Sequence, residues 1–309
     1  MEVLEREEWQ ARAASHAARV DAWVTPHLER RGARVKHPVH DFLFTYYSQR
    51  PAQLRRWHPG HGTGLADAPE YDGLKGYGSV DGDGDGDVDG GAGVLGVSAE
   101  HVARQRPLLE ATRRLLRATA SRPAQLGCFG LHEWAMVYRL ADDETRHSDW
   151  PLRLGPEGTD TVVESHRIAC SHFDAFRFFT EPARPLNTLS PAVDDRADFE
   201  QPGCLHAGMD LYKHAFRLSP MVSSDLVADC FELAREIRVL DMRAAPYDLS
   251  GLEVDGQPFT PVRIETAEGK REYAAAQADF AERAAPLRAR LLAACEYLVR
   301  TAADTGAHG

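Results

Sequence analysis

Apolar residues recur every three or four positions over five long segments, and this spacing constrains the chain to a largely helical fold. The interval matches one face of an α-helix, which repeats about every 3.6 residues. Helices are therefore predicted over Glu5–Arg31, Ser98–Thr119, Pro202–Leu218, Ser224–Met242 and Ala267–Thr301.

Apolar stripes and prolines refine these predictions. In the first helix the stripe consists of Ala14, Ala18, Trp23 and Leu28. A shorter helix is predicted over Val39–Arg50, because the residue before a proline disfavours helical geometry and Pro51 follows. Pro286 predicts a kink in the last helix, since proline removes a helical hydrogen bond.

Two segments rich in β-forming residues predict a small antiparallel sheet. They are Leu131–Leu140 and Thr161–Ala169, with Val162–Ala169 inside the sheet, although the first segment also fits a short helix. Pro261–Glu265 is expected to be a further short strand. The predicted fold is therefore α+β: a predominantly helical single domain over residues 1–309, with a small antiparallel sheet.

Residues 60–97 interrupt the helical pattern, and within them residues 80–91 are a run of Gly and Asp. Asp81, Asp83 and Asp85 fall at the first ligand positions of a calcium-binding loop, but the last position, which calls for Glu, holds Ala92. A flexible insertion with an acidic surface segment is the expected structure.

Charge and cysteine usage limit the function classes. The net charge of −11 disfavours a DNA-coating protein, because phosphate binding depends on clustered Lys and Arg. Five scattered cysteines without a Cys-x-x-Cys pair suit a reducing cytoplasm, as does a charged N-terminal segment without an apolar run. No stretch is apolar enough for a membrane helix, so no membrane partner is expected.

The segment from Glu164 to Asp174 is the densest group of titratable residues. As a strand it would carry Glu164, His166 and His172 on one face. Two imidazoles and a carboxylate on one face can hold a divalent transition metal, zinc or iron, or can transfer protons. An exposed edge strand with ordinary polar residues is the alternative, and the sequence fixes no cofactor.

The predicted helix after Pro202 carries a second group. His206, Asp210 and Lys213 share a face at helical spacing, beside an apolar stripe that includes Tyr212. A carboxylate at the edge of a core, next to Lys and His, suits a general base or an electrostatic stabiliser. A surface row of ion pairs is the alternative.

A third group, His132-Glu133-Trp134, follows the glycine-containing segment Gly127–Gly130 and is typical of a pocket wall. It is not the His-Glu-x-x-His metal motif, because position 136 is Met. Near the end of the Ser224 helix, Asp241 and Arg243 are interpreted as a salt-bridged helix terminus. Nucleophile-elbow, phosphate-loop, dinucleotide and di-iron motifs are absent from the sequence.

Six blocks together resemble a group of actinobacterial proteins commonly labelled 3-methyladenine DNA glycosylase. The blocks are His37–Tyr47, Arg50–Gly60, Gly127–Arg139, His166–Phe179, Gln201–Lys213 and Leu240–Leu249. The resemblance implies a hydrolase that cleaves the N-glycosidic bond to an alkylated purine in DNA repair. The helix-hairpin-helix with a following Asp, which well-characterised glycosylases carry, is not found, so the resemblance assigns no catalytic residue.

Two functions therefore remain open, with a non-catalytic binding module as a third. A glycosylase needs a carboxylate and surfaces that hold a flipped base. Candidates for catalysis are Asp174, Asp210, Glu133 and Lys213, and candidates for binding a modified base are Trp134, Phe173, Phe176, Tyr212 and Arg177. A metal-dependent enzyme acting on a small molecule would use ligands from His132, His166, His172, His206 and Glu164.

Both functions predict that the segments around His132, His166, His172 and His206 converge in one pocket. Buried ionisable groups are costly unless they are paired or bound to a metal. Four such segments are stabilised more easily together than each in isolation.

Overall fold

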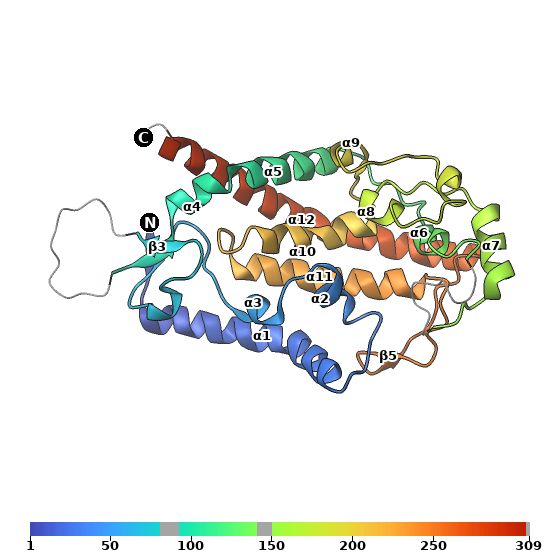
Figure 1. Cartoon of the computed structure of the whole chain (residues 1–309), viewed down its shortest axis with the longest axis horizontal. Helices are drawn as coiled ribbons and strands as arrows, with labels where there is room; N and C mark the ends of the chain where they lie inside the picture. Colours follow the sequence, from blue (N-terminus) through green and yellow to red (C-terminus); the bar gives the residue numbers. More distant parts are fainter. Residues whose placement is uncertain (81–92, 141–149, 307–309) are drawn as a thin grey trace. The chain divides into compact units, whose positions relative to one another are not determined.

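The computed structural model describes residues 1–80, 93–140 and 150–306, and it is about 56% helical with a small sheet (Figure 1). The predicted helical α+β class is confirmed. All five long predicted helices are present, the second as two consecutive helices. They are α1 (Arg6–Gly32), α4 (Ala99–Arg104) with α5 (Arg106–Ala120), α10 (Leu205–Arg217), α11 (Ser224–Arg243) and α12 (Ala267–Gly306).

The chain divides into two compact units, each assembled from separate segments. Unit 1 contains Met1–Arg114, Leu211–Glu232 and Leu287–Gly309, and unit 2 contains Leu115–Asp210 and Leu233–Pro286. Helices α5, α10, α11 and α12 contribute residues to both units. The single domain expected from the sequence stays a prediction.

Unit 1 contains a four-stranded sheet in the order β1-β2-β4-β3. Its strands are β1 (Glu2–Leu4), β2 (Thr63–Leu65), β3 (Tyr77–Ser79) and β4 (Leu95–Val97). The β1–β2 pair is parallel, with Val3 opposite Gly64, and the other two pairs are antiparallel. A cluster of buried side chains joins this sheet to α1: Leu4, Trp9, Trp57, Leu65, Ala68 and Tyr71.

The location of the sheet corrects two expectations. The sheet does not contain Val162–Ala169, and three of its strands come from residues 60–97, which were expected to be a flexible insertion. Within that range a 3₁₀ helix, η1 (Pro69–Tyr71), precedes β3, and the Tyr71 hydroxyl donates to the Trp57 carbonyl oxygen over 2.7 Å. Residues 81–92, which include the acidic run after Val80, lie outside the described residues.

Helix α1 was predicted with the wrong face inward. The residues that it buries are Trp9, His16, Val20, Val24 and His27, whereas Ala14, Ala18 and Leu28 are exposed. Two buried imidazoles explain the difference, because each has a hydrogen-bonding partner. A ring nitrogen of His16 lies 2.9 Å from the Leu54 carbonyl oxygen, and one of His27 lies 2.9 Å from an Asp41 carboxylate oxygen.

Proline begins a helix in unit 1 where it was expected only to end one. The predicted helix Val39–Arg50 is reduced to α2 (Phe42–Tyr46), and α3 (Pro51–Arg55) starts at the proline itself. Proline suits the first turn of a helix, where its missing N–H has no partner to lose. Ser98, at which the second long helix was predicted to begin, caps α4, since its hydroxyl accepts a hydrogen bond from the His101 amide.

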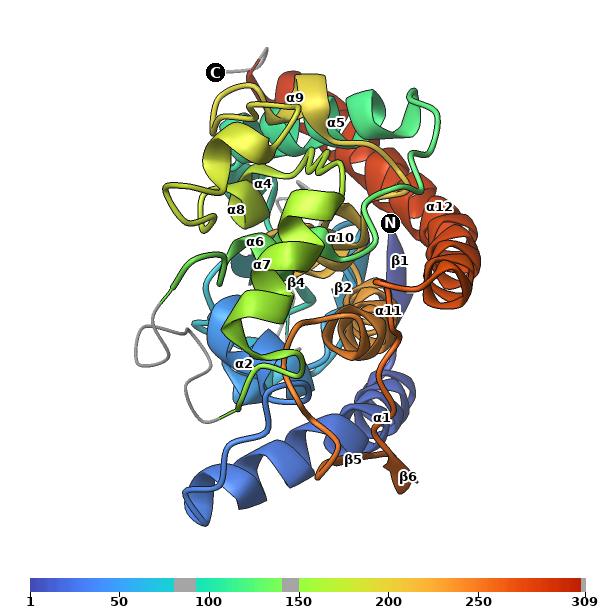
Figure 2. The same cartoon turned by 90° about the vertical axis from the view of Figure 1, so that its right-hand side faces the viewer.

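Unit 2 is helical where a hairpin was predicted. Helix α6 (Leu131–Ala135) lies in the first expected strand, so the alternative of a short helix is the correct one there. Helix α7 (Gly155–Ser165) includes the first residues of the second expected strand, and the two helices contact each other (Figure 2). Thr159, Val162 and Val163 are buried at the i, i+3, i+4 spacing of a helix, so tertiary packing overrides their β preference. Residues 261–265 form no strand, and the only sheet pair among the described residues of this unit is β5 (Glu253–Val254) with β6 (Gln257–Pro258).

Short helices complete unit 2: α8 (Phe173–Phe176), η3 (Arg184–Leu186) and α9 (Arg196–Phe199). Among the described residues, no helix has the length and apolar composition needed to cross a membrane.

Candidate functional site

The turn before α6 brings Cys128 close to His132. Phe129 and Gly130 have φ angles of 49° and 68°, in the left-handed region, and the Glu133 amide donates to the Gly130 carbonyl oxygen. A Cβ atom on Gly130 would lie 3.2 Å from the Cβ of Ala244, so glycine suits both the conformation and the close packing. The turn leaves the Cys128 Sγ 3.8 Å from Nδ1 of His132.

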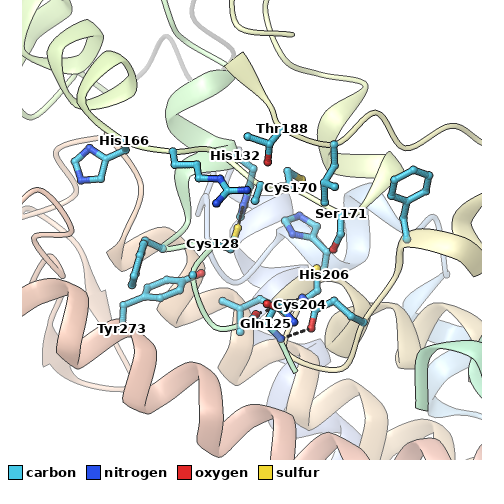
Figure 3. A pocket seen from close by; sticks show the side chains of 18 of the residues that line it. Gln125, Cys128, His132, His166, Cys170, Ser171, Thr188, Cys204, His206 and Tyr273 are labelled. Atoms are coloured by element: carbon cyan, nitrogen blue, oxygen red, sulfur yellow. Dashed lines mark hydrogen bonds between the residues drawn. The ribbon is translucent and has the colours of Figure 1, made fainter. Parts of the chain in front are cut away.

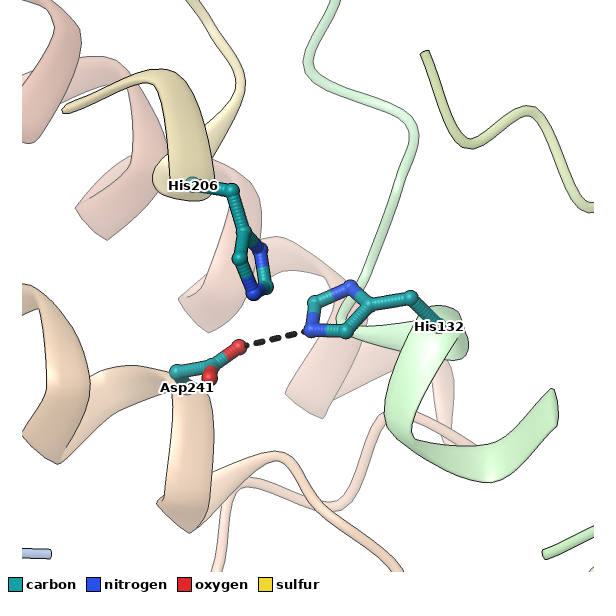
Figure 4. A group of neighbouring side chains, drawn as sticks. All are labelled: His132, His206 and Asp241. Atoms are coloured by element: carbon teal, nitrogen blue, oxygen red, sulfur yellow. Dashed lines mark ion pairs between the residues drawn. The ribbon is translucent and has the colours of Figure 1, made fainter. Parts of the chain in front are cut away.

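Three helices of unit 2 direct one side chain each toward a common point (Figure 4): His132 from α6, His206 from α10 and Asp241 from α11. One donor atom of each lies within 4.8 Å of the other two, and all three residues are buried. The rings of His132 and His206 are nearly perpendicular, with centroids 4.5 Å apart. We call these three residues the His-His-Asp group.

The contact between His132 and Asp241 is a close ion pair that does not meet hydrogen-bonding geometry. Nε2 of His132 lies 3.0 Å from Oδ1 of Asp241, yet neither atom has a partner of hydrogen-bonding geometry within the described part of the chain. Protonation of His132 accounts for the pair in one way, and a shared bound ion that replaces the proton accounts for it in another.

Arg238 and Glu133 hold the other side of Asp241. Nη1 of Arg238 donates to Oδ2 of Asp241 over 2.6 Å and to Oε1 of Glu133 over 3.1 Å, and the Arg238 side chain is 1% exposed. This pairing fixes the Asp241 carboxylate and leaves its Oδ1 directed toward the imidazoles. Outer partners of this kind orient metal-binding carboxylates in proteins.

The buried charges separate the pKa values of the two imidazoles. Burial acts to lower the pKa of His132, but the Asp241 charge outweighs it and raises the pKa well above its usual value. Burial and the neighbouring His132 hold the pKa of His206 well below its usual value. Burial acts to raise the pKa of Asp241, yet His132 and Arg238 hold it well below its usual range. His206 is therefore neutral and can offer a ring nitrogen lone pair.

A cavity of about 690 Å³ opens beside the His-His-Asp group (Figure 3). His132, His206 and Cys128 line it, and its other polar or aromatic lining residues include Gln125, Phe129, Arg167, Ser171, Thr188, Phe199, Lys270 and Tyr273. Arg122, Arg167 and Lys270 contribute positive charge, and no Asp or Glu is among its described lining residues. The cavity therefore suits a small polar molecule with negative charge.

A second buried ionic group lies next to His206. The rings of His172 and His206 have centroids 5.3 Å apart, and Nε2 of His172 lies 3.4 Å from Oδ2 of Asp210. Arg196 binds the same Asp210 oxygen at 2.8 Å and Glu200 at 2.5 Å. Because Arg196 occupies its carboxylate, Asp210 is tied into this network instead of facing the cavity as a general base.

The rings of His132, His172 and His206 lie in contact with one another through His206, as the expected convergence requires, but of these three only His132 and His206 are lining residues of the cavity. His166 lines the same cavity, but it lies apart from the other imidazoles in Figure 3, and its Nδ1 is 2.6 Å from the Val162 carbonyl oxygen. Glu164 is exposed and binds Tyr138 and Arg139, so it is not part of the His-His-Asp group.

Two carboxylates proposed for catalysis have local partners. Glu133 pairs with Arg238, as described above. Asp174 lies 3.4 Å from Arg177 and 3.7 Å from Arg196, at the edge of the second ionic group. Neither carboxylate is a lining residue of the cavity.

Several residues proposed to bind a base do not line the cavity. Trp134 is fully buried and its indole N–H donates to the Ala244 carbonyl oxygen over 2.8 Å, which leaves no face for stacking. Tyr212 and Lys213 belong to unit 1, where Tyr212 packs against Phe231. Phe173, Phe176 and the exposed Arg177 lie on or after α8 and are not lining residues.

The sequence pattern did not predict that Asp241 belongs to the His-His-Asp group or that Arg238 orients it. Both residues lie in the amphipathic helix α11, where only a helix terminus was considered. Asp241 follows Ile237 by four positions and therefore shares its buried face, a signal that the apolar pattern of α11 already contained. Both residues form the salt bridges predicted near this helix terminus, Arg243 with Glu272 and Asp241 with Arg238. The prediction did not include the full burial of Asp241 or its contact with His132. Tyr273 from α12, fully buried at the cavity wall, had no such signal.

No protein-family model, curated protein or solved structure matches this chain.

Proposed function

We propose that the protein is a metal-dependent enzyme that hydrolyses a small, negatively charged molecule in the cavity of unit 2. The observation that carries the proposal is the buried His-His-Asp group, with donor atoms within 4.8 Å of one another at the cavity wall. Catalytic zinc sites typically have three protein ligands and one open position for water or substrate.

The distance between the donor atoms of His132 and Asp241 fits a tetrahedral ion. Bonds of about 2.0–2.1 Å place neighbouring ligand atoms roughly 3.3 Å apart, close to the 3.0 Å between His132 and Asp241. The His206 ring faces the same pair (Figure 4). Arg238 binds Oδ2 of Asp241, so Oδ1 is available to bind an ion. The ion would supply a Lewis acid at the cavity wall.

Charge balance supports the same assignment. Without an ion, protonated His132 and Arg238 offset Asp241 and Glu133, so the buried group is neutral. A divalent ion that replaces the His132 proton adds one net positive charge. An anionic substrate group next to the ion neutralises this charge, in agreement with the cationic cavity lining.

Zinc suits this cavity better than iron. Cys128, Cys170 and Cys204 all line it as free thiols. Oxygen chemistry at an iron centre would oxidise neighbouring thiols, whereas zinc has no redox chemistry. We therefore propose zinc, and the metal content of the purified protein distinguishes the two.

Metal analysis of protein prepared without a His tag tests the proposal. We expect about one zinc per chain in the wild type, consistent with one three-ligand site. His206→Ala should lose the zinc. His166→Ala is the matched control, because it removes an imidazole from the same cavity but outside the His-His-Asp group. Zinc retained by His206→Ala would contradict the site.

A second candidate function rests on the short distance between Cys128 and His132. The Sγ of Cys128 lies 3.8 Å from Nδ1 of His132, and Nε2 of the same ring lies 3.0 Å from Oδ1 of Asp241. This order of residues resembles a nucleophile, a base and an orienting carboxylate. Cys128 is partly exposed to the cavity, whereas burial raises the pKa of both Cys170 and Cys204. In this function Cys128 would pass its proton to His132 and attack the carbonyl carbon of an ester, the alcohol would leave with that proton, and water would hydrolyse the resulting thioester to restore the thiol. No metal would be required.

Alkylation separates the two functions. Iodoacetamide should label Cys128 ahead of Cys170 and Cys204 if His132 activates the thiol, and His132→Ala should slow the labelling by about tenfold. Hydrolysis of small esters should then survive a chelator and be lost in Cys128→Ala. The metal function predicts the opposite sensitivity to the chelator.

The N-glycosylase function implied by the sequence resemblance stays a proposal with less support from the site. Its proposed carboxylate Asp210 is bound by Arg196, and Trp134 and Tyr212 do not line the cavity. Release of alkylated purine from DNA, lost in both Asp174→Asn and Asp210→Asn, would favour this function over the other two.

A further inference from the structure

Unit 1 contains a second cavity, of about 440 Å³, whose charged lining residues are all cationic. Arg56, Lys75 and Arg217 line it, and no Asp or Glu is among its described lining residues. This is unusual for a chain with a net charge of −11. A volume of this size is typical of a small-ligand pocket, for which about 300–1,000 Å³ is usual.

These cations differ from their neighbours because they form no ion pair with another described residue. Arg55, the residue before Arg56, does not line the cavity, and its Nε lies 2.6 Å from Asp21. Positive charges held around a cavity without carboxylate partners attract anions, and Arg and Lys are the residues that bind phosphate groups most often.

Two imidazoles in the same wall respond to this positive charge. Burial and the neighbouring Arg56 lower the pKa of His58 to about 4, and burial together with Arg104 and Lys75 lowers the pKa of His101. Both rings are therefore neutral near neutral pH. Neutral imidazoles offer hydrogen bonds to a ligand without adding further repulsion between cations.

A buried amide provides the independent sign of a ligand. Gln49 lines the cavity and is only 6% exposed, yet its Oε1 has no hydrogen-bonding partner within residues 1–80, 93–140 and 150–306. A buried acceptor without a partner is costly, and a hydroxyl group of a ligand would satisfy it. Phe216 and Met221 supply an apolar wall for the carbon skeleton of such a ligand.

We propose that this cavity binds a small phosphate monoester with free hydroxyl groups, of the sugar phosphate class. The phosphate contacts Arg56, Lys75 and Arg217, and a hydroxyl donates to Gln49. The described lining residues of the site all belong to unit 1, and none of them lines the cavity of unit 2. It therefore does not depend on the function proposed for the His-His-Asp group.

Calorimetric titration of the full chain with ribose 5-phosphate, inorganic phosphate and ribose tests the proposal. We expect ribose 5-phosphate to bind more tightly than either of the other two compounds. Arg217→Gln should raise its Kd by about tenfold or more, because a charge-assisted hydrogen bond is lost. Arg55→Gln is the matched control and should change the Kd by less than about twofold.

Gln49→Leu separates the hydroxyl contact from the phosphate contact. It should weaken binding of ribose 5-phosphate and leave the weaker binding of inorganic phosphate unchanged. Absence of binding by the ester at millimolar concentration would overturn the proposal. So would equal affinity for inorganic phosphate, equal affinity of the Arg217→Gln protein, or preferential binding of duplex DNA that is lost in the same variant.

Discussion

Asp241 shows how much a single buried carboxylate can determine in this protein. It lies 3.0 Å from His132 and accepts a hydrogen bond from the fully buried Arg238. Removal of one partner from a buried ion pair leaves an uncompensated charge, which costs far more than the loss of an exposed pair. The residue therefore matters for the stability of unit 2 as well as for the proposed metal site.

Asp241→Asn should destabilise the protein by about 3–5 kcal/mol, because Arg238 and His132 lose the charge that offsets them. Asp255→Asn removes an exposed partner of Arg235 and should cost less than about 1 kcal/mol. Urea unfolding of both variants measures the difference. Equal stabilities of the two variants would mean that the buried charges are compensated in another way.

His58 should make the stability of the protein depend on pH. In the folded chain, burial and Arg56 lower the pKa of His58 to about 4. In the unfolded chain the same imidazole takes up a proton near its ordinary pKa of 6.5. The penalty is absent above about pH 6.5, grows as the pH falls toward about 4, and is constant below that, with an upper bound of about 3 kcal/mol.

His58→Gln should remove this contribution, and urea unfolding at several pH values between about 4 and 8 measures it. The expected result is a smaller loss of stability at acidic pH in the variant than in the wild type. The Tyr77 hydroxyl, 3.0 Å from Nδ1 of His58, can keep a partner in the glutamine amide. Parallel pH profiles of the two proteins would show that His58 does not resist protonation in the folded state.

At the scale of elements, apolar spacing was sufficient for the long helices but not for their buried faces or for the short elements. Helices α10 and α11 follow the pattern closely, since most of their buried residues are apolar. In α1 the pattern chose the wrong face, because His16 and His27 are buried through contacts with Leu54 and Asp41 that only the folded chain provides. At α7 the β-forming residues predicted a strand, but packing of Thr159, Val162 and Val163 in the folded chain stabilises a helix.

The candidate site was predictable in part. His132 and His206 stood out because each lies beside an apolar stretch, and both belong to the His-His-Asp group. The apolar pattern of α11 indicated that Asp241 is buried, but not which imidazoles it meets, since His132 and His206 are 109 and 35 positions away in the sequence, by subtraction of the residue numbers. Long-range pairing of this kind has no signal in one sequence.

Gly130 fixes the entry to α6 and therefore the position of His132. Gly130→Ala should destabilise the protein by about 1–3 kcal/mol, because the φ of 68° strains a residue with a side chain and the new Cβ would press on Ala244. It should also weaken zinc binding. Gly251→Ala is the matched control, since nothing lies within 4 Å of its Cβ position. Unfolding and zinc titration of both variants test this, and wild-type behaviour of Gly130→Ala would contradict it.

At the scale of the whole molecule, the proposed ligands join parts of unit 2 that are distant in sequence. His132 and His206 belong to the segment Leu115–Asp210, and Asp241 belongs to Leu233–Pro286. An ion held by all three binds the folded unit far better than the unfolded chain, in which these residues are far apart. Its binding free energy therefore adds to the stability of the fold.

Removal of zinc should accordingly lower the melting temperature. A free zinc concentration one hundredfold above the Kd contributes about 2.7 kcal/mol, which for a chain of 309 residues corresponds to a rise in melting temperature of roughly 4 °C. Thermal unfolding with and without a chelator measures the shift. His206→Ala should melt at nearly the same temperature in both conditions, because it lacks a ligand, whereas His166→Ala should keep the full shift. A chelator effect of equal size in His206→Ala would mean that any stabilising metal is bound elsewhere in the chain.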